Sequence, residues 1–260
     1  MPVSFGSISL PTRTVKPRDS GITMVLDSGL GLNATKDLVE TAGDYIDIVK
    51  LGWGTSRLFS DELLKKKVEL MKSHGIKVCP GGSFVEIAAA QNKVDEFFGN
   101  AKAIGFDCVE VSNGVHPMSE EEKIGIIKKA VAHGFSVTSE VGKKNPEEDA
   151  LLSADDRVRL AEQELEAGAW KVIMESRASG KLGMFDSSGK VKEEMAKELF
   201  SRLDISKIIF EAPAKAQQLW LIERLGNDVN LGNIRPDDAI PLETLRLGLR
   251  GDTLKKYHLE

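Results

Sequence analysis

Acidic residues close a series of short apolar runs along this chain. The runs are MVLD at 24–27, CVEV at 108–111, SVTSEV at 136–141, KVIME at 171–175 and IIFE at 208–211. If they are parallel strands of one barrel, their carboxylates meet at one mouth. Like charges that converge there must be protonated or countered by cations, and carboxylate oxygens are ligands of Mg²⁺. The sequence predicts a Mg²⁺ site with these ligands: Asp27, Glu110, Glu175 and Glu211.

Lysines accompany these acids. A sixth run, IDIVKLG at 46–52, carries Asp47 low on its strand, where we expect a structural role, and Lys50 nearer the mouth. The segment SEVGKK places Glu140 and Lys143 within one short stretch. A lysine shielded among carboxylates could act as a general acid or base. We therefore predict Lys143, Lys50 and Glu140 as catalytic residues, with a solvated loop lysine as the simpler alternative, above all for Lys144.

Three loops have the composition of anion sites. RASGKLGMF offers a guanidinium, a hydroxyl and backbone N–H donors in one turn, and GNIRPDD follows the last predicted strand. PGGS at 80–83 is a third glycine turn that leads into a helix, and GWGTS at 52–56 could present amides in the same way, with Trp53 packed. Each loop could also be only a tight connection. The predicted substrate-binding residues are Arg177, Ser179, Gly180, Lys181, Asn233 and Arg235.

These residues need a scaffold in which strands and helices alternate. Continuous β-branched runs predict eight strands at about 22–27, 46–51, 76–79, 107–111, 135–140, 170–175, 207–211 and 228–231. Amphipathic patterns between them predict helices at 33–43, 60–74, 86–104, 119–133, 154–167, 190–202, 214–225 and 240–249. The spacing of about 30 residues matches a βα unit. An open doubly wound sheet is disfavoured, because LDSGLGLN lacks the third glycine of the dinucleotide fingerprint.

The predicted fold is therefore a single-domain (β/α)₈ TIM barrel over residues 21–260. Residues 1–20 are expected to form an irregular N-terminal strap across the barrel bottom or against a neighbour. Ser60, Ser119 and Ser153 are predicted N-caps, the second in a capping box with Glu122. Helix ends are predicted before glycines that suit a left-handed backbone, namely Gly75, Gly105, Gly134, Gly168 and Gly226.

Charge and composition exclude several classes of protein. A net charge of −5 argues against a nucleic-acid or anionic-membrane surface, so no such partner is expected. No stretch reaches the roughly 18 apolar residues of a membrane span, and the first 21 residues lack the apolar core of a signal peptide, which predicts a cytoplasmic protein. Cys79 and Cys108 show no metal or disulfide pattern and are expected to be buried and reduced.

Longer segments resemble one family. The chain resembles the phosphosulfolactate synthases nearly end to end, in DYIDIVKLGWGTS (44–56), VEVSNG (109–114), SEVGKK (139–144), ESRASGK (175–181), IIFEAPAKAQQ (208–218), VNLGNI (229–234) and LETLRLGLRGDT (242–253). The resemblance implies an enzyme of sulfolactate and coenzyme M biosynthesis that adds sulfite to phosphoenolpyruvate with Mg²⁺, giving (2R)-phospho-3-sulfolactate.

The resemblance also implies roles for residues and an assembly. Sulfite would attack C3, charge would pass into the substrate carboxylate, and Lys143 would protonate C2. Arg177, Lys181 and Arg235 would meet the anionic groups. The family implies a homo-oligomer, a trimer, with phosphoenolpyruvate and sulfite as its small-molecule partners.

Two other readings stay open at this point. The chain also resembles, more weakly, the plant heat-stress-associated proteins, which would make it a non-catalytic barrel that acts through interactions. Alternatively, Lys50 or Lys171 could form a Schiff base, as in a lysine aldolase.

Overall fold

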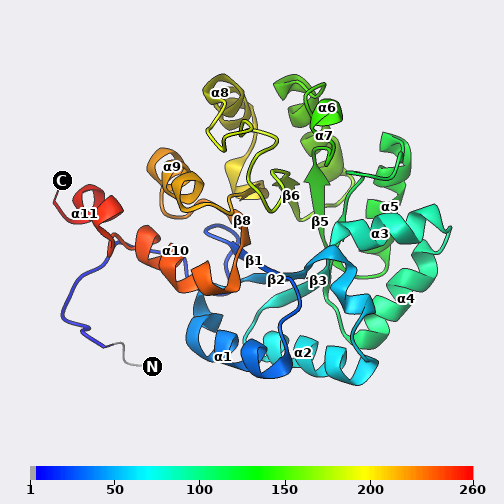
Figure 1. The fold of residues 1–260 in the computed structure, drawn as a ribbon, viewed down its shortest axis with the longest axis horizontal. Helices are drawn as coiled ribbons and strands as arrows, with labels where there is room; N and C mark the ends of the chain where they lie inside the picture. The colour runs from blue at the N-terminus through cyan, green and yellow to red at the C-terminus, as the bar shows by residue number, and fades with distance from the viewer. Residues whose placement is uncertain (1–3, 260) are drawn as a thin grey trace.

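The computed structural model describes residues 4–259, in which eight parallel strands are surrounded by helices (Figure 1). The strands are β1 (Thr23–Asp27), β2 (Ile48–Leu51), β3 (Lys77–Pro80), β4 (Cys108–Val111), β5 (Ser136–Val141), β6 (Lys171–Met174), β7 (Ile208–Glu211) and β8 (Leu231–Ile234). They form one sheet in the order β3-β2-β1-β8-β7-β6-β5-β4, with every pairing parallel. The predicted (β/α)₈ barrel is confirmed.

Helices follow the strands and cover the outside of the sheet. They are α1 (Leu32–Ala42), α2 (Asp61–Ser73), α3 (Gly82–Ala90), α4 (Val94–Ile104), α5 (Glu120–Ala132), α6 (Pro146–Asp149), α7 (Ala154–Glu166), α8 (Glu193–Arg202), α9 (Lys215–Leu225), α10 (Ala239–Arg246) and α11 (Gly251–His258). Short 3₁₀ helices are η1 (Gly43–Tyr45), η2 (Gly52–Arg57), η3 (Ile205–Lys207) and η4 (Pro236–Asp238). In Figure 1, α11 lies beyond α10, outside the ring of helices.

The barrel is nearly closed. β3 and β4, at the two ends of the strand order, lie beside each other. Across this junction the Val78 N–H donates to Asp107 Oδ1 at 3.0 Å, next to β4, and Lys77 Nζ reaches Ser136 Oγ of β5 at 3.1 Å. Closure leaves little free sheet edge, and it gathers the carboxyl ends of all eight strands around one opening.

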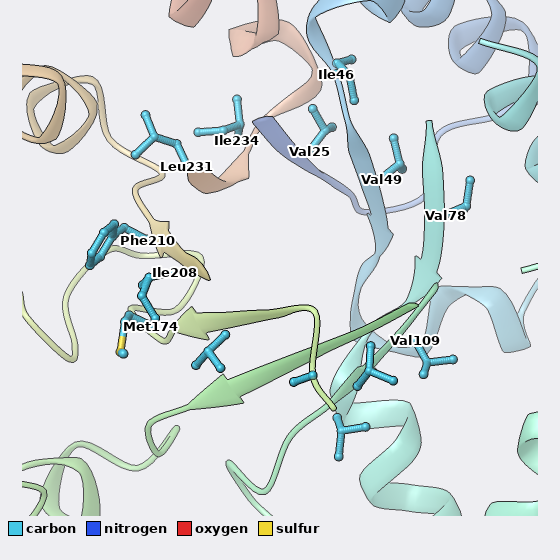
Figure 2. Close-up of a cluster of buried hydrophobic side chains, with 14 of the residues drawn as sticks. Val25, Ile46, Val49, Val78, Val109, Met174, Ile208, Phe210, Leu231 and Ile234 are labelled. Atoms are coloured by element: carbon cyan, nitrogen blue, oxygen red, sulfur yellow. The ribbon is translucent and has the colours of Figure 1, made fainter. Parts of the chain in front are cut away.

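Two apolar layers stabilise the barrel. Between sheet and helices lies the main core, whose side chains point away from the barrel interior in Figure 2; among those labelled are Val25, Val49, Val78, Val109, Met174, Phe210 and Ile234. Inside the barrel lies a smaller cluster of Ile22, Met24, Ile48, Cys79, Cys108, Ile173 and Ile209. Both cysteines are buried and free, as predicted. This interior apolar layer lies directly below the polar side chains at the mouth of the barrel.

Most predicted helix ends are correct. Ser60, Ser119 and Ser153 are the N-caps of α2, α5 and α7, and Ser119 forms the expected capping box with Glu122. The glycines after the helices all have positive φ, namely Gly75, Gly105, Gly134, Gly168 and Gly226. The helix predicted at 86–104 is wrong in extent, because the chain turns at Asn92 (φ 54°) and divides it into α3 and α4.

The eighth strand lies three residues later than predicted. Gly232 and Asn233 are typical of a turn, yet both lie inside β8. A Cβ at position 232 would lie 2.7 Å from Met24 Cε and 3.0 Å from Ile209 Cγ2, so glycine fits there because the barrel interior is full. Asn233 is consequently a strand residue and not part of the following loop.

The N-terminal segment contacts the barrel bottom. Residues 4–20 form no helix or strand. Arg13 joins them to the loop before β8 and to α10, because it pairs with Asp228 and Glu243. Arg18 Nε lies 3.0 Å from Asp47 Oδ1, and Asp47 Oδ2 accepts the Thr23 N–H at 2.8 Å. Asp47 thus has the structural role expected. Residues 1–3 of the predicted strap lie outside the described residues.

Replacing Asp47 by alanine should destabilise the fold. The change leaves the buried Arg18 guanidinium and the Thr23 N–H without this partner, so we expect the free energy of unfolding to fall by about 3–5 kcal/mol. Urea unfolding measures it. Asp44→Ala, at an exposed neighbouring position, is the control and should change stability by less than about 0.5 kcal/mol. Equal stability of the two variants would contradict this role for Asp47.

Candidate active site

Four buried glutamates surround one lysine at the carboxyl end of the barrel. Glu110 in β4, Glu140 in β5, Glu211 at the end of β7 and Glu175 just after β6 are each at most 2% exposed. Lys50, in β2, places its Nζ 3.0 Å from Glu110 Oε2, 3.2 Å from Glu211 Oε1 and 4.0 Å from Glu140 Oε2. These four carboxyl groups therefore converge at the mouth of the barrel, as the sequence predicts.

Lys144 is the second cation of the cluster. Its Nζ lies 2.9 Å from Glu140 Oε1 and 2.6 Å from Glu175 Oε2. Two ammonium groups thus face four carboxyl groups, and full ionisation of the cluster would leave two negative charges in excess. Buried charge of that kind is stable only if some carboxyl groups keep their protons or another cation binds.

Backbone amides hold three of the glutamates in place. The Gly82 N–H, in the first turn of α3, donates to Glu110 Oε1 at 2.8 Å. The Ser176 N–H donates to Glu211 Oε2 at 2.9 Å, and the Arg177 N–H donates to Glu175 Oε1. These bonds fix the carboxylates from the loops that follow β3 and β6, so the loop conformations and the cluster depend on each other.

The pKa values of the carboxyl groups diverge. Burial raises the pKa of Glu175 well above its ordinary value, and Glu140 and Glu211 add to this against the opposing effect of Lys144. Burial also raises the pKa of Glu110, although Lys50 opposes it. For Glu140 burial acts in the same direction, but Lys144 and Lys50 outweigh it and lower its pKa to about 2. Glu175 is the carboxyl group that most favours a proton, and Glu140 is firmly ionised.

Both lysines are firmly protonated. Burial alone would lower the pKa of Lys50, but the surrounding carboxylates, chiefly Glu110 and Glu211, raise it well above its ordinary value. For Lys144, burial is likewise outweighed by Glu140 and Glu175, and the pKa is raised. Each is an ammonium group that donates hydrogen bonds, and neither is a free amine at neutral pH.

The donor set fits a hard divalent cation. Glu140, Glu175 and Glu211 each offer one carboxylate oxygen, and these oxygens all lie within 4.8 Å of one another. Mg²⁺ prefers oxygen ligands and usually takes one or two carboxylates plus water and substrate oxygens. A divalent cation would also offset the two excess negative charges and allow Glu175 to ionise. These three residues could therefore hold Mg²⁺.

A cavity of about 500 Å³ opens above the cluster. Its walls include Trp53 from η2, the PGGS turn at Gly81–Ser83, Arg177 and Ser179 after β6, and Asn233 in β8. This volume suits a small polar ligand. Asn233 has a left-handed backbone (φ 53°), and within residues 4–259 its buried Oδ1 has no hydrogen-bond partner. That oxygen is available to a ligand.

Three of the six predicted substrate-binding residues line this cavity. They are Arg177, Ser179 and Asn233. Gly180 is buried in the same turn, where its carbonyl accepts a 2.7 Å hydrogen bond from Gln217 Nε2. Lys181 and Arg235 do not line the cavity, and Arg235 pairs instead with Asp237, with Nη2 and Oδ2 2.7 Å apart.

Asp27 lies outside the carboxylate cluster. Its Oδ2 is 2.7 Å from Nζ of Lys67, a fully buried residue of α2, and its Oδ1 accepts the Gly29 and Leu30 N–H groups. Both oxygens are therefore used within the fold. The structure does not bring Asp27 to the other predicted metal ligands, because a helix lysine that cannot be identified from the strand pattern neutralises it.

The two lysines of SEVGKK face different sides. Lys143 Nζ donates to the Asn113 carbonyl at 2.7 Å and lines a separate cavity, whereas Lys144 lines the mouth. Of these two lysines, the structure thus places Lys144, and not the predicted Lys143, beside the carboxylates. The signal that could have found Lys144 is the strand period of two, since Thr138 and Glu140 face inward and positions 142 and 144 continue that side.

Trp53 also differs from its prediction. It is 65% exposed at the edge of the cavity, with φ 54°, and does not pack into the core. The following Gly54 has φ 67°, so two consecutive left-handed residues form this turn. This uncommon backbone conformation holds the Trp53 ring at the mouth of the barrel. The hydrophobicity of tryptophan alone predicts a buried position instead.

Comparison with known proteins identifies the family. Residues 11–252 match the family described as (2R)-phospho-3-sulfolactate synthase (ComA). The chain belongs to the phosphosulfolactate synthase family. It is 48% identical over 250 residues to the phosphosulfolactate synthase of Methanothermobacter thermautotrophicus, covering 96% of this chain and 97% of the relative. It is 43% identical to that of Bacillus subtilis over 248 residues, covering 95% and 97%. The predicted enzyme class and resemblance are confirmed.

More distant similarities concern the plant relatives and the fold. The protein HEAT-STRESS-ASSOCIATED 32 of Arabidopsis thaliana is 25% identical over 259 residues, covering 90% of this chain and 88% of the relative. Among solved structures, a phosphonopyruvate hydrolase complex with oxalate and Mg²⁺ has a TM-score of 0.57 at 17% identity, covering 86% of this chain and 79% of that one. At this identity the likeness shows the barrel fold alone. Within residues 4–259, no helix is long and apolar enough to span a membrane.

Removing the central ammonium should make stability depend on pH. In Lys50→Met the ammonium that opposes the rise is gone, so burial and the Glu140 carboxylate raise the pKa of Glu110 further in the folded state. The folded protein then binds more protons than the unfolded one above pH 4.3 or so. Stability then falls as pH rises. We expect a loss of about 3–5 kcal/mol at pH 8 and a smaller loss at pH 5.

Urea unfolding of the metal-free protein at both pH values measures this effect. Lys66→Met is the control, because Lys66 and Glu62 form an exposed pair on α2 that contributes about 0–1 kcal/mol. A loss for Lys50→Met that is the same at pH 5 and pH 8 would show that Lys50 does not balance the charge of the carboxylates.

Proposed function

We propose that the chain catalyses the Mg²⁺-dependent addition of sulfite to phosphoenolpyruvate, giving (2R)-phospho-3-sulfolactate. The observation that carries the proposal is the buried cluster of Glu140, Glu175 and Glu211 with Lys50 and Lys144, which lies under a cavity lined by anion-binding groups. The names of the curated relatives support the same reaction. The small-molecule substrates expected of such an enzyme match the size of the cavity.

Glu140, Glu175 and Glu211 would hold the Mg²⁺ ion. When bound, the ion supplies electrostatic stabilisation of the charge that develops on the substrate carboxylate during addition. The ionised state of Glu140 suits a cation, and Glu175, whose pKa is raised by burial, would have to lose its proton to act as a ligand. Asp27 has no part in this proposal, because Lys67 neutralises it.

Anionic substrates would be met by donors on the cavity wall. Arg177 and Ser179 offer a guanidinium and a hydroxyl group, and Ser83 lines the cavity in the first turn of α3, which has no acidic residue. Helix N-termini with free N–H groups bind phosphate and carboxylate. We leave Lys181 and Arg235 out of the proposed substrate contacts.

Lys144 is the proposed proton donor. Addition forms a bond between sulfur and C3, moves the double-bond electrons toward C2 and the carboxylate, and ends when C2 takes a proton. Lys144 stands at the cavity as an ammonium group, held by Glu140 and Glu175. Binding of a cation by these carboxylates would remove the partners that raise its pKa and make it a stronger acid. Lys143, which faces away, is not placed for this step.

The Schiff-base alternative has less support. A lysine nucleophile must be a free amine, and the carboxylates around Lys50 hold it protonated. Lys171 Nζ donates to the carbonyls of Asp19 and Ser206, at the N-terminal end of β6, far from the mouth.

The proposed assembly and location rest on the resemblance. We propose a homo-oligomer, a trimer, that works in the cytoplasm without nucleic-acid or membrane partners. The exposed apolar side chains of Phe5 and Ile8 on the N-terminal segment support burial against another copy of the chain.

The experiment is an assay of purified protein with Mg²⁺, sulfite and phosphoenolpyruvate, in which ³¹P NMR follows phosphosulfolactate. Lys144→Ala should lower kcat by about 10²–10⁴-fold, since it removes the general acid. Lys143→Ala is the matched control and should keep most of the activity. Urea unfolding establishes that both variants fold.

Two results would count against the proposal. Absence of product from the wild type at varied pH and metal would favour an interaction role like that of the stress-associated relative. Full activity of Lys144→Ala would remove its role as acid and leave the reaction itself in place.

A further inference from the structure

A second cavity lies on the other side of the SEVGKK turn. It measures about 240 Å³ and lies between α5, α7 and the end of β5. Apolar side chains form much of its wall, among them Met118, Ile124, Leu152 and Leu160. Lys143 lines it as well. None of these residues lines the cavity at the mouth, so the two spaces are separate.

The Lys143 ammonium has unused donors. It carries three N–H groups, and one donates to the Asn113 carbonyl at 2.7 Å. Within the part of the chain that the structure describes, no carboxylate forms an ion pair with it. At this half-buried position the remaining N–H groups can donate to an anion.

The other charges around this cavity are already paired. Lys123 Nζ lies 2.6 Å from Glu164 Oε1 and donates to the Glu140 carbonyl at 2.6 Å. The second oxygen of Glu164 accepts from Ser139 Oγ. Glu120, at the rim, pairs with Arg159. Among the charged residues that line this cavity, Lys143 is therefore the one that forms no ion pair within residues 4–259.

We propose that this cavity binds a small monoanion with a short apolar body, either a carboxylate or a sulfonate. The anionic group pairs with Lys143, and the apolar part packs against Met118, Ile124 and Leu160. The volume lies below the usual 300–1,000 Å³ or so of drug-sized pockets, which limits the ligand to a few carbon atoms. A dianion would bring an uncompensated charge close to Glu164 and is disfavoured.

The ligand would border the catalytic turn without entering the mouth. Lys143 and Lys144 are adjacent, and Lys123 links the second cavity to the backbone of Glu140. A bound anion would hold Lys143 and with it the turn that carries Lys144. The site is thus placed to regulate the enzyme, and its occupant need not compete with substrate.

The test follows methyl groups by NMR in protein labelled at the methionine methyls. Butanoate and propane-1-sulfonate are titrated separately, so each anion class is an arm of its own. For at least one of them, the Met118 methyl should shift and saturate, while Met24, inside the barrel, stays unchanged. Lys143→Met should weaken binding about tenfold or more, because it removes a charge-assisted hydrogen bond. Lys128→Met, at an exposed position on α5, should bind as wild type does.

Two further variants separate the site from the mouth. Leu160→Phe keeps Lys143 but narrows the cavity. It should weaken the binding of the anion, and it tests the site even if Lys143→Met fails to fold. Lys144→Met should leave binding unchanged. The proposal is overturned if neither ligand shifts Met118, if Lys143→Met and Leu160→Phe bind as wild type does, or if Lys144→Met abolishes binding. None of these readouts requires turnover, so they are independent of the proposed reaction.

Discussion

Excess negative charge buried at the mouth of the barrel is the constraint around which this structure is organised. Four carboxyl groups stand within reach of two ammonium groups, on top of an apolar interior that offers them no solvation. Such a group is costly unless each oxygen has a donor. Lys50 and Lys144 supply part of the compensation, and backbone N–H groups of the loops after β3 and β6 supply more. What remains is a deficit of positive charge that a divalent cation is suited to fill.

The loops that hold this cluster are themselves held by buried charges outside it. Asp149 accepts the N–H groups of Lys143 and Gly183 at 3.0 Å each and pairs with Arg157, so the loops after β5 and β6 are joined. Glu86 of α3 accepts the N–H groups of Gly114, Val115 and His116, which fixes the loop after β4. Lys144 is positioned between these two anchors, because its N–H donates to the Gly114 carbonyl at 3.0 Å. Rigid loops of this kind keep like charges in place before a ligand arrives.

Much of the barrel could be predicted from sequence, since β-branched runs, N-cap serines and C-terminal glycines are local signals. All five strand-end acids were also predicted to converge, because parallel strands require it, and four of them do. The sequence did not show that Asp27 lies outside the cluster, since its ion-pair partner Lys67 is on a helix 40 residues further along the chain. The side on which Lys143 and Lys144 face depends on how the chain continues past Gly142 (φ 140°), so the sequence did not show that Lys144 is the one that lines the mouth. β8 was predicted too early in the chain, because Gly232 looks like a turn residue. It is a strand residue because a larger side chain would not fit inside the barrel, and no local sequence pattern shows this.

The central claim is that the acidic mouth is a cation site completed by Lys50 and Lys144. Its most direct test is a crystal structure of the protein with Mn²⁺ in place of Mg²⁺, with the ion located by its anomalous scattering. The account predicts one strong peak coordinated by carboxylate oxygens of Glu140, Glu175 and Glu211, with Lys50 still paired to Glu110. Absence of a peak at saturating Mn²⁺, or a peak held by Asp27 and other residues instead, would contradict it.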